Sequence, residues 1–155
     1  MLSEAAPAFF NFLNTLEGTN PIAATHVAGD VVRIGEPGLI PGADFRPAQP
    51  DEFISLFGTG FGPTQPAVPA GAIPLNVLPA SNGQASVVGN ASLTIGGIPV
   101  APGDLLYVGV APCCAGLYQV VAKVPANAPD GNLPVVLTIN GLSTPQGPYI
   151  TVRKP

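Results

Sequence analysis

Residues 116–125 read GLYQVVAKVP, and this stretch decides the fold class. Every second residue is apolar, and the apolar set is Tyr118, Val120, Ala122 and Val124. Successive side chains of a β-strand point to opposite faces, so the alternation predicts a half-buried antiparallel strand. Pro125 has no backbone N–H to donate to a sheet, and it predicts the end of the strand. We expect a central strand of a β-sandwich here, with residues 104–110 and 133–139 as its neighbours.

Short β-runs separated by turn residues continue on both sides of this strand. The chain contains 20 prolines and 19 glycines in 155 residues, and no window offers a long uninterrupted amphipathic helix. Residues 52–58 alternate as a strand that is covered on both faces. Gly96-Gly97 separates two short β-runs, residues 92–95 and 98–101, which is typical of a two-residue hairpin. The pattern predicts an all-β antiparallel sandwich.

The N-terminal third differs in composition from the rest. Residues 35–50 are punctuated by proline and glycine without any period, which indicates a connection. We therefore divide the chain into residues 1–50, an extended segment followed by a β-hairpin, and residues 51–155, the sandwich domain. The hairpin is expected over residues 22–34, with its turn at residues 28–30.

The composition favours association with other proteins. Hydrophobic residues make up 46% of the chain and charged residues only 9%, where soluble domains carry about a quarter. The net charge is −4, and we expect no patch from the five basic residues, which are Arg33, Arg46, Lys123, Arg153 and Lys154. We exclude nucleic acid, which needs clustered cations, and a membrane span, which needs a longer apolar run. Residues 2–12 lack the basic start of a signal peptide, so we expect no signal sequence in this chain. Because the surface carries few charges, we expect the partner to be a second copy of the chain or a neighbouring domain.

Cys113 and Cys114 are the only cysteines, and they are adjacent. Three states are open: two reduced small hydrophobic side chains, a vicinal disulfide that rigidifies the corner, and a crosslink to another subunit. If the chain lies outside the cell, an oxidised state is favoured, because free thiols are liabilities there. We expect no zinc site, since the chain has one histidine and no C-x-x-C spacing.

No motif for catalysis or for a cofactor stands out. His26 is the only histidine, and nothing in the sequence places a serine or Cys113 beside it, so a structural histidine is favoured. Residues 58–62 read GTGFG, but Pro63 prevents the helix that a dinucleotide fingerprint needs, and we expect a tight bend. The acidic residues occur singly beside turns, which disfavours a glycosidase pair or a calcium site. We expect neither enzyme activity nor a cofactor.

Four blocks of the chain have a pattern seen in known domains: ISLFGTGFGP (54–63), LTIGGIPV (93–100), LYVGVAPCCAGLYQVVAKV (106–124) and PVVLTINGLSTPQGPYITVR (134–153). With these blocks the chain resembles the Solibacter-type uncharacterised C-terminal domain, a family of repeated Ig-like domains in secreted bacterial proteins that is abundant in Acidobacteria. The resemblance implies an Ig-like sandwich that is extracellular or at the bacterial cell surface, in arrays or at the end of larger proteins. It carries over no catalytic residues. The family has glycine and a bulky apolar residue where this chain has Cys113-Cys114.

Phe9, Phe10 and Phe12 form the most aromatic stretch of the chain. We expect the segment around them either to pack on its own domain or to add as a strand to the sheet edge of a neighbouring subunit, where backbone groups are unpaired. The expected function is therefore that of a non-catalytic structural subunit that acts through protein–protein contacts. Its sharper form is self-assembly into a filament or array.

The alternative function is that of a carbohydrate- or ligand-binding module of a secreted enzyme or adhesin. Tyr107, Tyr118 and Tyr149 would then contact the ligand. The absence of tryptophan argues against stacking on a sugar ring, although tyrosine can serve. A third and weaker alternative is a hydrolase built around His26.

Overall fold

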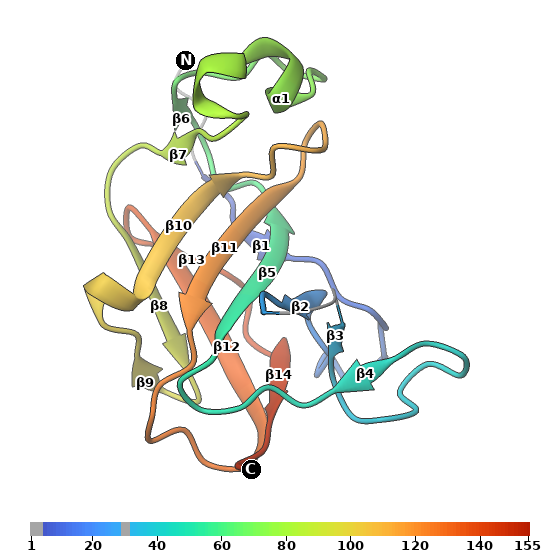
Figure 1. Cartoon of the computed structure of the whole chain (residues 1–155). Helices are drawn as coiled ribbons and strands as arrows, with labels where there is room; N and C mark the ends of the chain where they lie inside the picture. The colour runs from blue at the N-terminus through green and yellow to red at the C-terminus, as the bar shows by residue number, and fades with distance from the viewer. Residues whose placement is uncertain (1–4, 29–31) are drawn as a thin grey trace.

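The structure is a computed structural model that describes residues 5–28 and 32–155. These residues form two β-sheets that lie face to face (Figure 1). The larger sheet, with β10, β11 and β5, is at the front of Figure 1, and the smaller sheet, with β8 and β12, lies behind it. The predicted all-β antiparallel sandwich is confirmed.

The first sheet is built around β5 (Phe53–Thr59) and β11 (Tyr118–Lys123), which pair antiparallel. Beyond β11 the sheet continues through β10 (Leu105–Val110), β7 (Ser86–Val87) and β6 (Thr64–Gln65). The other edge of β5 is occupied by short N-terminal strands and their neighbours: β1 (Ala8–Phe9), β2 (Ala24–His26), β3 (Arg33–Ile34) and β4 (Phe45–Arg46). All these pairs are antiparallel except β3 with β4.

The second sheet is built around β12 (Gly131–Ile139). β12 pairs with β8 (Ala91–Ile95), β13 (Leu142–Ser143) and β14 (Tyr149–Val152), and β9 (Ile98–Pro99) pairs with β8. Gly96 and Gly97 have positive φ and form the two-residue turn between β8 and β9, so the predicted hairpin is confirmed. The helices are short: α1 (Pro74–Val77), η1 (Pro79–Ser81) and η2 (Pro102–Asp104).

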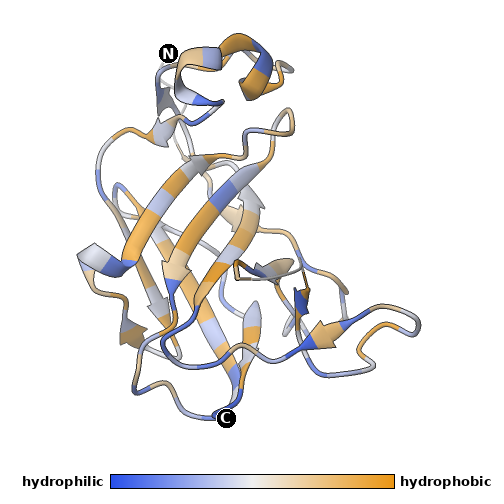
Figure 2. Cartoon of the chain, viewed as in Figure 1, coloured by the Kyte–Doolittle hydropathy of each residue, from blue (hydrophilic) through white to orange (hydrophobic). Residues whose placement is uncertain are grey.

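The hydrophobic core lies between the two sheets. β11 contributes Val120 and Ala122, and Val124 follows them, all fully buried as the alternation predicted. The strands of both sheets are largely hydrophobic, with polar residues in between (Figure 2). One expectation is wrong: residues 133–139 belong to β12 in the facing sheet, and β5 is the second neighbour of β11. Alternation identifies the buried face of a strand, but it does not identify the strand that pairs with it.

The first 50 residues share the core of the sandwich. β2 pairs with β5, β3 pairs with β2 as the predicted hairpin requires, and the predicted turn at residues 28–30 lies largely outside the described residues. Ile22 and Ala48 are buried in the same cluster as the residues of both sheets. Both also lie beside β14, since the Ile22 and Ala48 N–H groups donate to carbonyls of that strand. The segment before residue 50 therefore closes one side of the sandwich.

Candidate functional site

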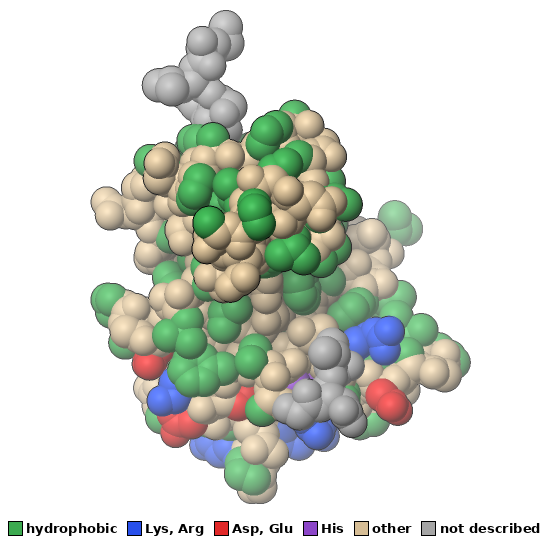
Figure 3. Space-filling model, turned by 45° about the horizontal axis from the view of Figure 1, so that its top comes forward, with side chains coloured by type: hydrophobic (Ala, Val, Ile, Leu, Met, Phe, Trp, Pro, Cys, Tyr) green, Lys and Arg blue, Asp and Glu red, His purple; other side chains and the backbone are tan. Residues whose placement is uncertain are grey.

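Among the residues that the structure describes, one end of the sandwich carries no charged side chain. Residues 53–122 contain a single charged residue, Asp104, and it lies before the start of β10, away from this end. We call the end formed by the close of β5, the α1 segment (residues 63–83) and the β10–β11 connection the uncharged end. Three apolar side chains of the α1 segment are exposed: Ile73, Leu75 and Val77. Figure 3 shows hydrophobic side chains gathered over this end, while the charged side chains lie toward the opposite end. An apolar, uncharged surface of this kind is typical of a protein–protein contact.

The N-terminal segment (residues 5–12) lies directly against the backbone of three glycines at this end. β1 pairs with the end of β5, and the Ala6 N–H donates to the Gly60 carbonyl (2.7 Å). A Cβ added to Gly58 would lie 2.5 Å from the Ala8 carbonyl oxygen, and one added to Gly60 would overlap the Ala6 carbonyl. We call these glycines the glycine track: Gly58, Gly60 and Gly62. Only glycine permits so close an approach of two backbones.

Residues 13–19 connect this segment to the rest of the domain, and all of them are exposed. The chain turns back here, because the Phe12 N–H donates to the Pro21 carbonyl (2.8 Å) and the Ala23 N–H to the Phe10 carbonyl (2.7 Å). The N-terminal segment therefore lies between the end of β5 and the residues that precede β2. A connection without buried residues opens at a small cost in free energy.

The three phenylalanines of the segment have different environments. Phe9 is 7% exposed and belongs to the core, whereas Phe10 is 44% exposed. Phe12 is half-buried, and its ring meets Phe45 edge-on with 5.2 Å between the ring centroids. The domain itself thus accommodates Phe9 and Phe12. The subunit contact expected for the three rings stays a prediction, and Phe10 is the ring left open to a neighbour.

Sequence reasoning expected only a bend at residues 58–62. The structure adds that the alternate glycines of this run hold the N-terminal segment. Gly58 lies in β5, and Gly60 and Gly62 follow the strand with φ of +73° and +92°, a backbone region that residues with a side chain rarely adopt. Three glycines at the end of a strand are the signal in the sequence, because glycine is found where a second backbone approaches closely.

The β10–β11 connection contains a disulfide between Cys113 and Cys114, so the vicinal disulfide is the state present in this structure. Cys113 is exposed and Cys114 is half-buried. The carbonyl of the preceding residue, Pro112, accepts a hydrogen bond from the Leu75 N–H of α1 (3.0 Å). The disulfide therefore lies in a corner that contacts the α1 segment.

The structure does not bring the three candidate tyrosines together. The Tyr107 hydroxyl donates to the Val110 carbonyl (2.6 Å), and the Tyr118 hydroxyl donates to the Gly62 carbonyl (3.0 Å). Burial raises the pKa of both phenols above its ordinary value, and a hydrogen bond with the Ala85 backbone partly opposes this rise for the pKa of Tyr107. Both hydroxyls therefore form hydrogen bonds within the domain.

Tyr149 lies elsewhere, in an open pocket of about 490 Å³ between the connection at residues 15–19 and the second sheet. The pocket is also lined by Thr15 and Thr19, which carry hydroxyls, by the carboxylate residue Glu17 and by the amide residue Asn132. An aromatic ring beside groups that donate and accept hydrogen bonds is typical of sites for small polar ligands. Tyr149 is the tyrosine that fits the ligand-contact role best.

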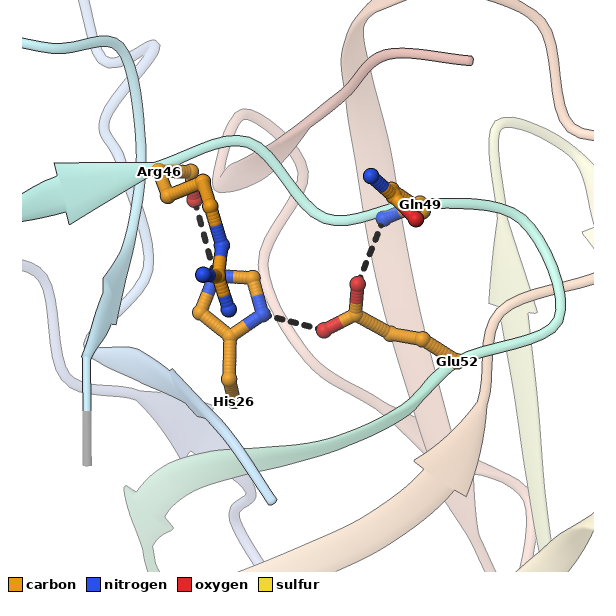
Figure 4. A network of polar contacts seen from close by, with 4 residues as sticks. All are labelled: His26, Arg46, Gln49 and Glu52. Carbon is orange, nitrogen blue, oxygen red and sulfur yellow. Dashed lines mark hydrogen bonds and ion pairs between the residues drawn. The ribbon is translucent and has the colours of Figure 1, made fainter. Parts of the chain in front are cut away.

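His26 is buried at the end of β2 and contacts other groups through both ring nitrogens (Figure 4). Nδ1 contacts a carboxylate oxygen of Glu52, and Nε2 donates to the Arg46 carbonyl (2.9 Å), since a carbonyl only accepts. The other oxygen of Glu52 accepts the Gln49 N–H (2.8 Å). The network ties β2 to the β4–β5 connection. Both ring nitrogens are engaged, which supports the predicted structural role and leaves neither nitrogen free to act as a catalytic base.

Three of the basic residues lie closer together than the sequence indicates. Arg46, Arg153 and Lys154 line a pocket of about 120 Å³, because Ala48 pairs with the end of β14. The expectation that the basic residues form no patch is wrong for these three. Glu36 accepts a hydrogen bond from the Arg153 guanidinium (2.7 Å), which offsets part of the charge. The cluster is much smaller than the rows of cations that bind a phosphate backbone.

Within residues 5–28 and 32–155, no three His, Cys, Asp or Glu side chains lie close enough to hold a metal ion. No helix in the described part of the chain is both long and apolar enough to cross a membrane. A scan against protein-family models finds no family that matches the chain, and a search of curated proteins finds no similar sequence. The functional conclusion therefore rests on the geometry of the uncharged end and of the segment bound there.

Proposed function

We propose that the chain is a non-catalytic structural module of the bacterial cell surface or extracellular space, and that it acts through protein–protein contacts at its uncharged end. In the sharper form of the proposal, neighbouring copies exchange their N-terminal segments. The observation that carries the proposal is the glycine track. It holds the segment largely through the backbone, and the same segment of a second copy can make the same contacts.

Exchange needs a connection that opens and a contact that is equally good within and between copies. Residues 13–19 are exposed and, when extended, span about 3.5 Å per residue. Because the contacts are the same in both forms, their free energies differ mainly by the conformation of this connection and by the concentration of the protein. A segment that passes from each copy to the next makes a head-to-tail assembly, and such an assembly grows into a filament when it does not close.

The experiment compares the full chain with a chain that lacks residues 1–13, by electron microscopy and by light scattering coupled to size exclusion. We expect oligomers or filaments from the full chain and none from the truncated chain. A synthetic peptide of residues 5–13 should bind the truncated chain with one-to-one stoichiometry and raise its melting temperature. The matched peptide with Phe9→Asp should do neither, because Phe9 is buried on binding. Monomers of the full chain at every concentration would contradict strand exchange.

The pocket around Tyr149 favours carbohydrate binding as a second candidate function. Its test is an NMR titration with the neutral disaccharides cellobiose and maltose. Binding predicts shifted resonances at Tyr149 and Asn132 that disappear in Tyr149→Ala. They should persist in Tyr107→Phe, whose hydroxyl lies in a different part of the molecule. No shift at millimolar sugar would rule this candidate out for both ligands.

A further inference from the structure

The disulfide of the β10–β11 connection is open to reagents in solution. Cys113 is exposed, and the connection belongs to the uncharged end. The single charged residue between 53 and 122, Asp104, lies before the start of β10, whereas the connection follows the end of that strand. Disulfides are opened by thiolate anions, and nearby carboxylates slow their approach by repulsion. This corner presents an exposed cysteine residue of the disulfide with little opposing charge among the described residues.

The same corner is in tight contact with the α1 segment. The Pro112 carbonyl accepts the Leu75 N–H at 3.0 Å. Gly83 lies beside both residues, since a Cβ added there would be 2.8 Å from the Leu75 nitrogen and 2.8 Å from the Pro112 Cβ. The start of α1, Gly83 and the residue before the disulfide therefore pack closely against one another.

We propose that Cys113–Cys114 is a thiol-exchange site and that its redox state controls how firmly the α1 segment is held. The reactant is a small thiol or dithiol. Its thiolate attacks the Cys113 sulfur, the S–S bond breaks, and Cys114 leaves as a thiolate that takes up a proton. A second thiol then attacks the mixed disulfide, releases the oxidised reagent and leaves Cys113 reduced, so two electrons pass to the protein.

Reduction of the disulfide should increase the conformational freedom of the backbone at Cys113 and Cys114. Cys113 and Cys114 are consecutive residues, so their disulfide closes a small ring that includes the peptide unit between them. A ring of this size limits the rotations of that peptide unit. Opening the ring restores rotation next to Pro112. The hydrogen bond from Leu75 then loses its fixed acceptor, and the exposed apolar side chains of the α1 segment become free to rearrange. This inference does not depend on strand exchange.

The test is hydrogen–deuterium exchange of the full chain, air-oxidised and after treatment with dithiothreitol. The Leu75 amide should exchange about tenfold faster after reduction, which corresponds to about 1.4 kcal/mol. The Val120 amide, in the centre of β11, should not change. In the double variant Cys113→Ser/Cys114→Ser, Leu75 should exchange at the fast rate with and without the reagent.

Two results would overturn the proposal. One is an unchanged Leu75 exchange rate in the reduced protein, which would separate the disulfide from the α1 segment. The other is a thiol titration that finds two free thiols in the air-oxidised chain. The single variants test the point of attack: glutathione disulfide should modify Cys113 in Cys114→Ser faster than Cys114 in Cys113→Ser, because Cys113 is the more exposed of the two.

Discussion

The two edges of β5 are occupied in different ways. On one edge β11 pairs with β5 from Phe53 to Gly58, and it buries Val120 and Ala122 in the core. On the other edge two short strands divide the length between them: β2 covers Ile54 to Leu56, and β1 covers only the end. The first edge is fixed by side-chain packing along a whole strand. The second ends in a segment that backbone contacts with glycines hold, with Phe9 as its buried anchor.

This difference separates a permanent strand pair from one that can be replaced. Side-chain packing specifies one partner, because the shapes of both strands must fit. A glycine surface specifies little beyond an extended backbone and one anchoring ring, so another copy of the same segment fits equally well. The following predictions test this contrast, from the largest expected effect to the smallest.

A cavity in the permanent β5–β11 strand pair should destabilise the whole domain. Leu56 is fully buried between the sheets, and Leu56→Ala should lower the free energy of unfolding by about 2–5 kcal/mol. Denaturant titration followed by circular dichroism measures the change. The loss should occur in one cooperative transition of both sheets, and separate transitions of the two sheets would contradict a shared core.

A methyl group added to the glycine track should release the N-terminal segment and leave the β5–β11 strand pair intact. Gly60→Ala places a Cβ against the Ala6 carbonyl and strains a backbone with φ +73°, at about 1–3 kcal/mol for the strain alone. The Ala6 and Phe10 amides should then exchange with deuterium as in an unfolded peptide. Gly71→Ala is the matched control, because Gly71 has φ +77° with no atom near its added Cβ. Equal release in both variants would attribute the effect to strain and not to docking.

The part of this edge formed by β2 should depend on the His26 network. His26→Ala removes two buried interactions, with Glu52 and with the Arg46 carbonyl, and should lower the free energy of unfolding by about 1–3 kcal/mol. Thermal unfolding by calorimetry provides the measurement. Faster exchange at His26 and Thr25, with Val120 unchanged, would confine the effect to β2, whereas unchanged stability would deny the network any structural role.

Removing the Tyr118 hydroxyl should have the smallest effect. Tyr118→Phe deletes the hydrogen bond to the Gly62 carbonyl and should cost about 0.5–1.5 kcal/mol.

High pH should destabilise the wild type through the phenols of Tyr107 and Tyr118. Burial raises the pKa of Tyr107 and of Tyr118 in the folded state, so above about pH 10 the unfolded chain releases protons that the folded chain retains. Stability should therefore fall as the pH rises through this range. Chemical denaturation at a series of pH values tests it, and Tyr118→Phe should show a shallower fall than the wild type.

Local patterns in the sequence predicted much of the two central sheets. The alternation from Tyr118 to Val124 predicted the buried face of β11, and Gly96-Gly97 predicted a hairpin, because both depend on neighbouring residues. The pairing of β11 with β5 was not predictable in this way, since several strands have an equally apolar face. The pairing of strands that are far apart in the sequence depends on the arrangement of the whole sheet, and a short stretch of sequence does not encode that arrangement.

The sites depended still more on distant residues. Arg46 approaches Arg153 only because Ala48 lies beside β14, and His26 meets Glu52 only after β2 has paired with β5. The alternate glycines at 58, 60 and 62 were visible in the sequence, but their meaning depends on a segment about 50 residues away. The adjacency of Cys113 and Cys114 suggested an oxidised pair, while the contact with Leu75 required the fold.

The most direct measurement is analytical ultracentrifugation of the wild type and of Gly60→Ala, each incubated at high concentration just below its melting temperature and then cooled. Strand exchange predicts oligomers of the wild type that form only after this treatment or at high concentration. It predicts monomers of Gly60→Ala, because the blocked track accepts a segment neither from its own chain nor from another. Oligomers of both proteins alike, or monomers of both, would contradict the exchange of the N-terminal segment.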